Sequence, residues 1–129
     1  MLEVRIIHPN ECITEVSSGE MTRVAGVSEA LSGATGIHMA KAIIQPGCSS
    51  SAHVHLNCES AIYVLNGHGK FMVGANLDRG IEFAPGDYLF IPPGAPHQPV
   101  NDGNEPIELL VARNTPVEIV RDYSPEGGV

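Results

Sequence analysis

The stretch GDYLFIPPGAPHQPVN, from Gly86 to Asn101, contains the most regularly spaced turn and polar residues of this chain. An apolar run at 88–91 is followed at once by two prolines and a glycine, and then by His97. Proline and glycine mark sharp turns after strands, so the stretch predicts a β-strand whose end turns and presents an imidazole. Whether that imidazole has a function depends on the rest of the chain.

A second stretch, HVHLNCE at 53–59, contains two of the six histidines of the chain and one of its fifteen acidic residues. Side chains alternate faces along an extended chain, so His53 and His55 point the same way, and Glu59 shares their parity. Imidazole and carboxylate groups together suit a divalent ion such as Mn, Fe, Ni, Co or Zn. By itself, the pattern is equally typical of two surface histidines near a turn.

Together the two stretches resemble the two sequence motifs of the cupin superfamily. The second motif of that family is a glycine, five residues, Pro-x-Gly, two residues, a histidine, three residues and an asparagine, and residues 86–101 match it at every position. The first motif is a glycine, five residues, His-x-His, three or four residues, a glutamate, six residues and a glycine. Its glycine, histidine and glutamate positions are matched by Gly47, His53, His55 and Glu59.

One position departs from the first motif. The closing glycine is expected at residue 66, which is Asn66, and the glycine comes one residue later, at Gly67. Counting back from Gly67 puts the acidic position at Ser60, but a hydroxyl is a poor ligand for a borderline ion. We therefore expect Glu59 to be the acidic ligand, with one extra residue, as a β-bulge, before the turn.

The resemblance implies both a fold and a metal site. The fold is an all-β, double-stranded β-helix, or jelly-roll barrel, of two antiparallel sheets. A single cupin domain would cover residues 1–129, with the first motif at 47–67 and the second at 86–101. One divalent transition metal ion would be held by His53, His55, Glu59 and His97. Asn101 is expected to stabilise the backbone near the last histidine rather than touch the metal.

The pattern of apolar runs and turn residues favours β-structure independently of the motifs. Asn66-Gly67 is a strong tight-turn pair, which predicts a hairpin between the runs at 61–65 and 69–73. Further strands are predicted at 3–7, 12–16, 36–45, 81–84, 88–91, 106–112 and 117–120, and one short helix at 28–31. The connections are too short for crossover helices, so the strands are expected to be antiparallel.

Two further residues are candidates for the catalytic site. Tyr63 lies in an apolar run, so it is either a core residue or a residue that brings its hydroxyl near the metal. Arg113 follows the run IELLVA, and its guanidinium either faces the cavity and holds a substrate carboxylate, or forms a surface salt bridge.

The resemblance leaves several functions open. Cupins include dioxygenases, decarboxylases, isomerases and lyases, so the fold does not select the reaction. We expect a metal-dependent enzyme, a cupin dioxygenase or isomerase for example, that acts on a small polar metabolite. The alternative is a non-catalytic cupin that binds a sugar or an organic acid. Single cupins commonly pair through their sheets, so we also expect a homodimer.

Charge and cysteine content limit the partners and the compartment. The chain has seven basic and fifteen acidic residues, for a net charge of −8, and its basic residues are scattered. Nucleic acids and anionic membranes require clustered positive charge, so neither is expected as a partner. No apolar run approaches the roughly 20 residues that span a bilayer. The three cysteines do not form a disulfide framework, which favours a reducing cytoplasm.

Overall fold

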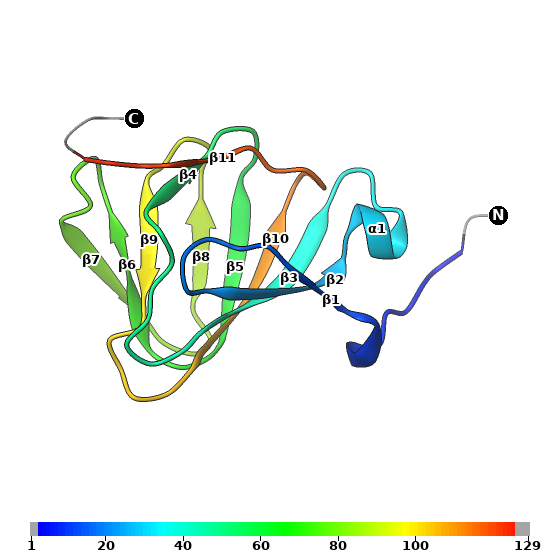
Figure 1. Cartoon of the computed structure of the whole chain (residues 1–129), viewed down its shortest axis with the longest axis horizontal. Helices are drawn as coiled ribbons and strands as arrows, with labels where there is room; N and C mark the ends of the chain where they lie inside the picture. The colour runs from blue at the N-terminus through cyan, green and yellow to red at the C-terminus, as the bar shows by residue number, and fades with distance from the viewer. Residues whose placement is uncertain (1–2, 126–129) are drawn as a thin grey trace.

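In the computed structural model, which describes residues 3–125, the chain folds into two antiparallel β-sheets that face each other (Figure 1). The six-stranded sheet has the order β1 (Ile13–Glu15), β2 (Thr22–Val27), β3 (His38–Ile44), β10 (Ile107–Arg113), β5 (Ser60–Asn66) and β8 (Tyr88–Ile91). The five-stranded sheet has the order β11 (Val120–Asp122), β4 (His53–His55), β9 (His97–Val100), β6 (Gly69–Val73) and β7 (Arg79–Phe83). The all-β, double-stranded β-helix predicted from the motifs is therefore confirmed.

Alternation along the strands produces the core. In β3, every second residue from His38 to Ile44 is buried, and Met39 and Lys41 lie on the outer face. The buried apolar side chains of both sheets form one cluster: Ala42, Ile44, Ile62, Val64, Phe71, Phe83, Ile91, Ile107 and Leu109. Burial of such side chains contributes roughly 1.5–3 kcal/mol each and is the main term that holds the sheets together.

The inner face of the six-stranded sheet changes from apolar to polar between one end of the strands and the other. At one end Ile44 lies opposite Ile107, and both are fully buried. At the other end Arg113 lies between His38 on β3 and Ser60 on β5. All three of these polar side chains are buried, so this end of the interior is polar and the other end is apolar.

The turn predicted at Asn66-Gly67 joins β5 to β6, but the predicted hairpin is wrong, because β5 pairs with β10 and β8 whereas β6 pairs with β7 and β9 in the other sheet. Gly67 has a φ of +84°, and a Cβ there would lie 2.5 Å from the carbonyl oxygen of Pro106. Only glycine fits both the left-handed backbone and the close approach. The pairing of β5 with β10 also shifts register, since Glu108 and Leu109 lie opposite Asn66 and Val64. The extra residue expected before the turn is therefore present.

Some predicted elements differ from those observed. Residues 3–7 form no strand, and a 3₁₀ helix, η1 (Pro9–Glu11), follows them. The last strand is Val120–Asp122 rather than 117–120. The helix α1 (Glu29–Ser32) begins after Ser28, whose hydroxyl accepts a hydrogen bond from the Leu31 amide. Three strands, β2, β4 and β9, carry no clear local signal, because β2 contains a glycine and the other two are short and contain histidine or proline.

Among residues 3–125, no helix is both long enough and apolar enough to cross a membrane.

Candidate metal centre

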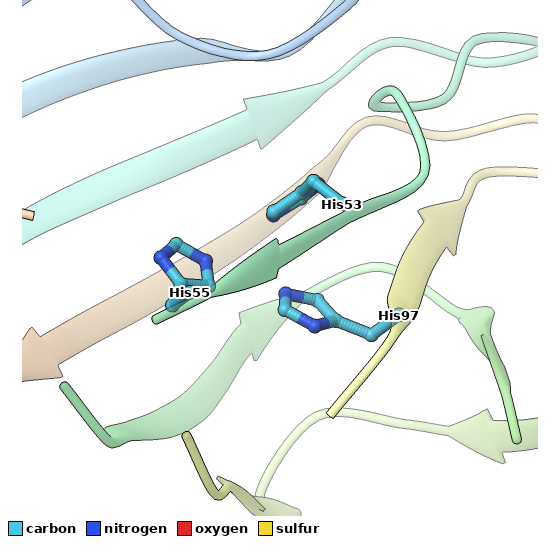
Figure 2. Close-up of side chains that lie close together, drawn as sticks. All are labelled: His53, His55 and His97. Carbon is cyan, nitrogen blue, oxygen red and sulfur yellow. The ribbon is translucent and has the colours of Figure 1, made fainter. Parts of the chain in front are cut away.

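Three histidines from two neighbouring strands converge inside the barrel (Figure 2). His53 and His55 lie on β4, and His97 lies on β9 directly opposite His53. Each ring offers one nitrogen, and these nitrogens all lie within 4.8 Å of one another. The ligand atoms bound to one ion lie about 3 Å from one another, so small side-chain rotations bring these three nitrogens to coordination distance.

Backbone carbonyls orient two of the three rings. His53 Nδ1 lies 2.6 Å from the Ser51 oxygen, and His97 Nδ1 lies 2.9 Å from the Ala95 oxygen. A carbonyl oxygen only accepts, so the ring proton is assigned to Nδ1, which leaves Nε2 with a free lone pair. Metal-binding histidines usually donate their other ring N–H to an oxygen in this way. The residues present therefore fit a metal ion.

Burial keeps these two imidazoles neutral. Desolvation lowers the pKa of His53, and it lowers the pKa of His97 to about 3, with the neighbouring His53 adding to the effect. Neutral imidazole is the form that binds a metal, so neither ring needs to lose a proton at pH 7 before it binds.

The third ring faces a carboxylate that sequence reasoning missed. His55 Nδ1 lies 3.0 Å from Glu118 Oε2, at an angle that falls short of a hydrogen bond, and it has no other partner among the described residues. Glu118 lies between β10 and β11, about sixty residues from the histidine in sequence, and only the folded chain brings the two together. No motif or spacing in the sequence points to Glu118.

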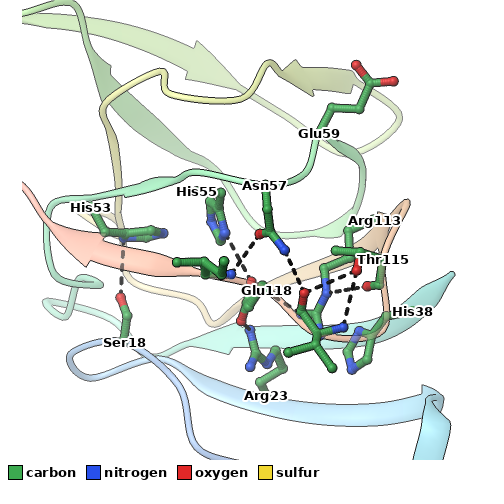
Figure 3. Close-up of polar contacts among 12 residues, drawn as sticks. Ser18, Arg23, His38, His53, His55, Asn57, Glu59, Arg113, Thr115 and Glu118 are labelled. Carbon is green, nitrogen blue, oxygen red and sulfur yellow. Dashed lines mark hydrogen bonds and ion pairs between the residues drawn. The ribbon is translucent and has the colours of Figure 1, made fainter. Parts of the chain in front are cut away.

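Two arginines surround Glu118 (Figure 3). Arg23 Nη1 donates to Glu118 Oε1 at 2.7 Å, and Arg113 Nη1 lies 3.3 Å from Glu118 Oε2. Burial by itself raises the pKa of Glu118, but His55 and the two guanidinium groups outweigh it and hold this pKa at about 2. The carboxylate is therefore ionised at neutral pH.

The structure does not bring Glu59 to the histidines. Its side chain is exposed and points away from them (Figure 3), and its backbone amide donates to Asn114 Oδ1. The expectation of a shared face assumed an extended chain, but the residues between β4 and β5 bend. Ser60 then begins β5 with its side chain buried in the cavity wall, so its neighbour Glu59 faces outward. The bulge in β5 lies too late in the chain to change this.

Tyr63 and Arg113 lie on opposite faces of the six-stranded sheet. Tyr63 is on the outer face, where its ring centroid lies 4.8 Å from that of Tyr88, so its hydroxyl does not approach the histidines. Arg113 is buried and lines the cavity. Besides its contact with Glu118, its guanidinium donates to the carbonyl oxygens of Thr115 and Pro116, both at 2.9 Å.

A cavity of about 420 Å³ adjoins the three histidines. One part of its wall is polar and includes Ser18, Arg23, His38, Ser60, Arg113 and Glu118. The larger part is apolar and includes Val16, Met21, Ala40, Ala42, Ile62, Phe71, Ile91, Pro99, Leu109, Val111 and Val120. A cavity of this kind can hold a small molecule whose polar atoms face the histidines and whose apolar part lies deeper.

Comparison with known proteins gives a consistent result. Residues 40–113, more than half of the chain, match the family profile described as "Cupin domain". An uncharacterised protein of Methanocaldococcus jannaschii is 32% identical over 78 residues, which span 60% of this chain and 60% of that protein.

Several solved structures share the fold. The polyketide cyclase RemF from Streptomyces resistomycificus superposes with a TM-score of 0.79 and 25% identity, over 93% of this chain and 85% of that chain. An oxalate decarboxylase from Lactobacillus farciminis superposes with a TM-score of 0.74 and 29% identity, over 89% of this chain and 34% of that chain. A putative sugar phosphate isomerase from Acidithiobacillus ferrooxidans superposes with a TM-score of 0.63 and 30% identity, over 78% of this chain and 65% of that chain.

Proposed function

The chain belongs to the cupin family, and on this premise we propose that it is a metal-dependent enzyme acting on a small molecule bound between its two sheets. The observation that carries the proposal is the convergence of three imidazoles on one point of the cavity wall. A buried cluster of this composition, with two rings oriented through Nδ1, is the arrangement that a metal ion requires.

The proposed cofactor is one divalent transition metal ion, Mn, Fe, Ni, Co or Zn, held by His53, His55 and His97. Three protein ligands leave coordination positions open, as catalytic sites do. When bound, the ion would supply Lewis-acid chemistry at a substrate oxygen. The side chains of the polar wall would orient the substrate, and the apolar wall would exclude water from it.

The proposed substrate has oxygen atoms that face the histidines and an apolar body. The polar wall agrees with the polar metabolite predicted from the sequence, and the larger apolar wall adds a carbon skeleton to it. Among the dioxygenase, isomerase, decarboxylase and lyase reactions expected of the family, we favour a non-oxidative one. The support is that similar structures are named as a cyclase, a decarboxylase and an isomerase.

Metal analysis tests the proposal first. The purified protein should contain about one divalent ion per chain, and His53→Ala and His97→Ala should lose it. Turnover of small oxygen-containing metabolites, carbonyl compounds among them, would then be screened with metal-loaded and chelator-treated protein. A full complement of metal in both variants would refute the site, and metal binding without turnover in any screen would weigh against the enzyme.

Ligand binding without catalysis is the alternative function. The guanidinium groups of Arg23 and Arg113, which line the cavity, favour it, because such groups bind carboxylates of organic acids. Their charges are already opposed by Glu118, which makes a free anion site less favourable than the metal site. Calorimetric titration of the metal-free protein with organic acids and sugars measures binding. Together with the turnover screen it separates the enzyme from the binding protein, since the alternative requires binding without turnover.

We also propose a homodimer that forms through the outer face of the six-stranded sheet. This face exposes large apolar side chains, among them Met39, Leu65, Tyr88 and Phe90. Exposed apolar patches of this kind mark interaction surfaces. Light scattering should give twice the 13.7 kDa chain mass for the wild type, and Phe90→Glu should reduce it to that of a monomer. The cytoplasmic location stays a prediction, which expression of a fluorescent fusion would test.

A further inference from the structure

Glu118 supplies a carboxylate beside a histidine cluster that Glu59, the acid matched to the first motif, does not reach. We propose that Glu118 is a positioning residue: it accepts the Nδ1 proton of His55 and thereby directs Nε2 of that ring toward the point shared with His53 and His97. This inference rests on the metal site proposed above. It assigns no catalytic step to Glu118.

The geometry of the three rings leads to this role. Two of them have Nδ1 within 2.9 Å of a carbonyl oxygen, from Ser51 and Ala95. No carbonyl of the described residues accepts a hydrogen bond from His55 Nδ1, and Glu118 Oε2 lies 3.0 Å from this nitrogen. Every ring of the cluster therefore has an oxygen beside Nδ1, and for the third ring this oxygen is charged. The distance already suits a hydrogen bond, so the ring has only to align its Nδ1–H with Oε2.

The carboxylate itself is held in place by charge. Arg23 binds Oε1 at 2.7 Å and Arg113 lies 3.3 Å from Oε2, and the Glu118 side chain is 13% exposed. A carboxylate in such surroundings stays where its partners fix it, because movement would separate buried opposite charges. Its two oxygens are thus engaged by the arginines and by His55, and neither belongs to the group of atoms within 4.8 Å that could share an ion. This favours positioning over direct coordination.

The backbone on both sides of Glu118 is tied to the segment that follows His55. The Asn57 side chain donates to the Val117 oxygen at 2.8 Å and accepts from the Ile119 amide at 2.7 Å (Figure 3). The Leu56 amide also donates to the Ile119 oxygen at 2.8 Å. The histidine and its carboxylate therefore belong to one hydrogen-bonded unit, which fixes their separation.

Nuclear magnetic resonance of the metal-free, chelator-treated protein tests the proposal directly. Two-bond proton–nitrogen correlation spectra of ¹⁵N-labelled protein show which ring nitrogen carries the proton. The wild type should have the His55 proton on Nδ1. Glu118→Ala should move a substantial fraction of it to Nε2, while His53 and His97 keep theirs on Nδ1. Glu118→Gln, whose amide oxygen still accepts, should resemble the wild type.

Zinc affinity, measured by competition with a chelator, is the second readout. Glu118→Ala should bind zinc about 10–100-fold more weakly, as is typical when a partner of a ligating histidine is lost. Glu59→Ala removes an equivalent but exposed carboxylate from the same region and should leave the affinity within about twofold. The visible spectrum of the cobalt-loaded Glu118→Gln variant should match that of the wild type, since no ligand is lost.

Three results would overturn the proposal: a His55 proton on Nε2 in the wild type, equal zinc affinities for Glu118→Ala and Glu59→Ala, or a changed cobalt spectrum in Glu118→Gln. If Glu118→Ala does not fold, the His55 tautomer of the wild type and the cobalt spectrum of Glu118→Gln still test the proposal. The tautomer is measured without metal or substrate, so a failure of the proposed enzyme activity leaves this test intact.

Discussion

Replacement of Asn101 by alanine should destabilise the fold by about 3 kcal/mol without touching the histidines. The Asn101 side chain is 1% exposed and makes three hydrogen bonds. Its Nδ2 donates to the oxygens of Ile44, at 2.9 Å, and Glu105, at 2.7 Å, and its Oδ1 accepts from the Gly103 amide at 3.0 Å. Each such bond contributes about 1 kcal/mol net, which gives the expected total.

Asn101→Asp separates the hydrogen bonds from the volume of the side chain. The aspartate keeps the acceptor for the Gly103 amide, but it places a carboxylate oxygen against two carbonyl oxygens. A buried charge that faces acceptors costs more than the bonds that it replaces, so Asn101→Asp should be less stable than Asn101→Ala at neutral pH.

Urea unfolding followed by circular dichroism measures these free energies. Asn104→Ala, an exposed asparagine of the same loop, is the matched control and should change the free energy of unfolding by less than about 0.5 kcal/mol. A loss below about 1 kcal/mol for Asn101→Ala would refute the assignment of the three bonds as an anchor. A variant Asn101→Asp that is more stable than Asn101→Ala would refute it as well.

Gly67, Glu118 and His97 provide three further tests. Gly67→Ala should cost about 2–4 kcal/mol because a Cβ meets the Pro106 oxygen at a φ of +84°, whereas Gly74→Ala, at +89° with nothing within 4 Å, should cost only about 1 kcal/mol in urea unfolding. Glu118 has a pKa of about 2 against an ordinary 4.5, so its ionisation stabilises the fold above pH 4.5. The wild type should therefore be more stable than Glu118→Gln by on the order of 2 kcal/mol at neutral pH, and this difference should disappear as the pH falls toward 2. A difference in unfolding free energy that persists at pH 2 would contradict the prediction. Zinc at 100 times its dissociation constant should stabilise the wild type by about 2.7 kcal/mol, seen as a higher melting temperature, and His97→Ala should show no such rise.

The predictions from short-range pattern agree best with the structure where the signal is local. The turn at Asn66-Gly67 is present because Gly67 adopts the left-handed backbone. The two strands that it joins nevertheless pair in different sheets, which the local signal does not reveal. The run at 88–91 forms a strand with the predicted bounds. Tyr63 could be placed on either face from sequence, and its position on the outer face depends on where β5 begins. Strands such as β4 are recognised only from the partners that they pair with.

The acidic residue of the site shows where the sequence stops being sufficient. The alternation of side chains predicts which face of the sheet a residue occupies only within one continuous strand. The bend between β4 and β5 interrupts this alternation between His55 and Glu59. The carboxylate that does face the histidine comes from Glu118, and its approach depends on the pairing of β11 with β4.

The sequence by itself determined the family, the two-sheet architecture and the positions of the histidines, because glycine, proline and histidine at fixed spacing constrain the backbone locally. Only the tertiary structure decided which carboxylate lies beside the histidines and which residues line the cavity. Those contacts join segments far apart in the chain, and their free energy depends on the packing of whole sheets rather than on any local pattern.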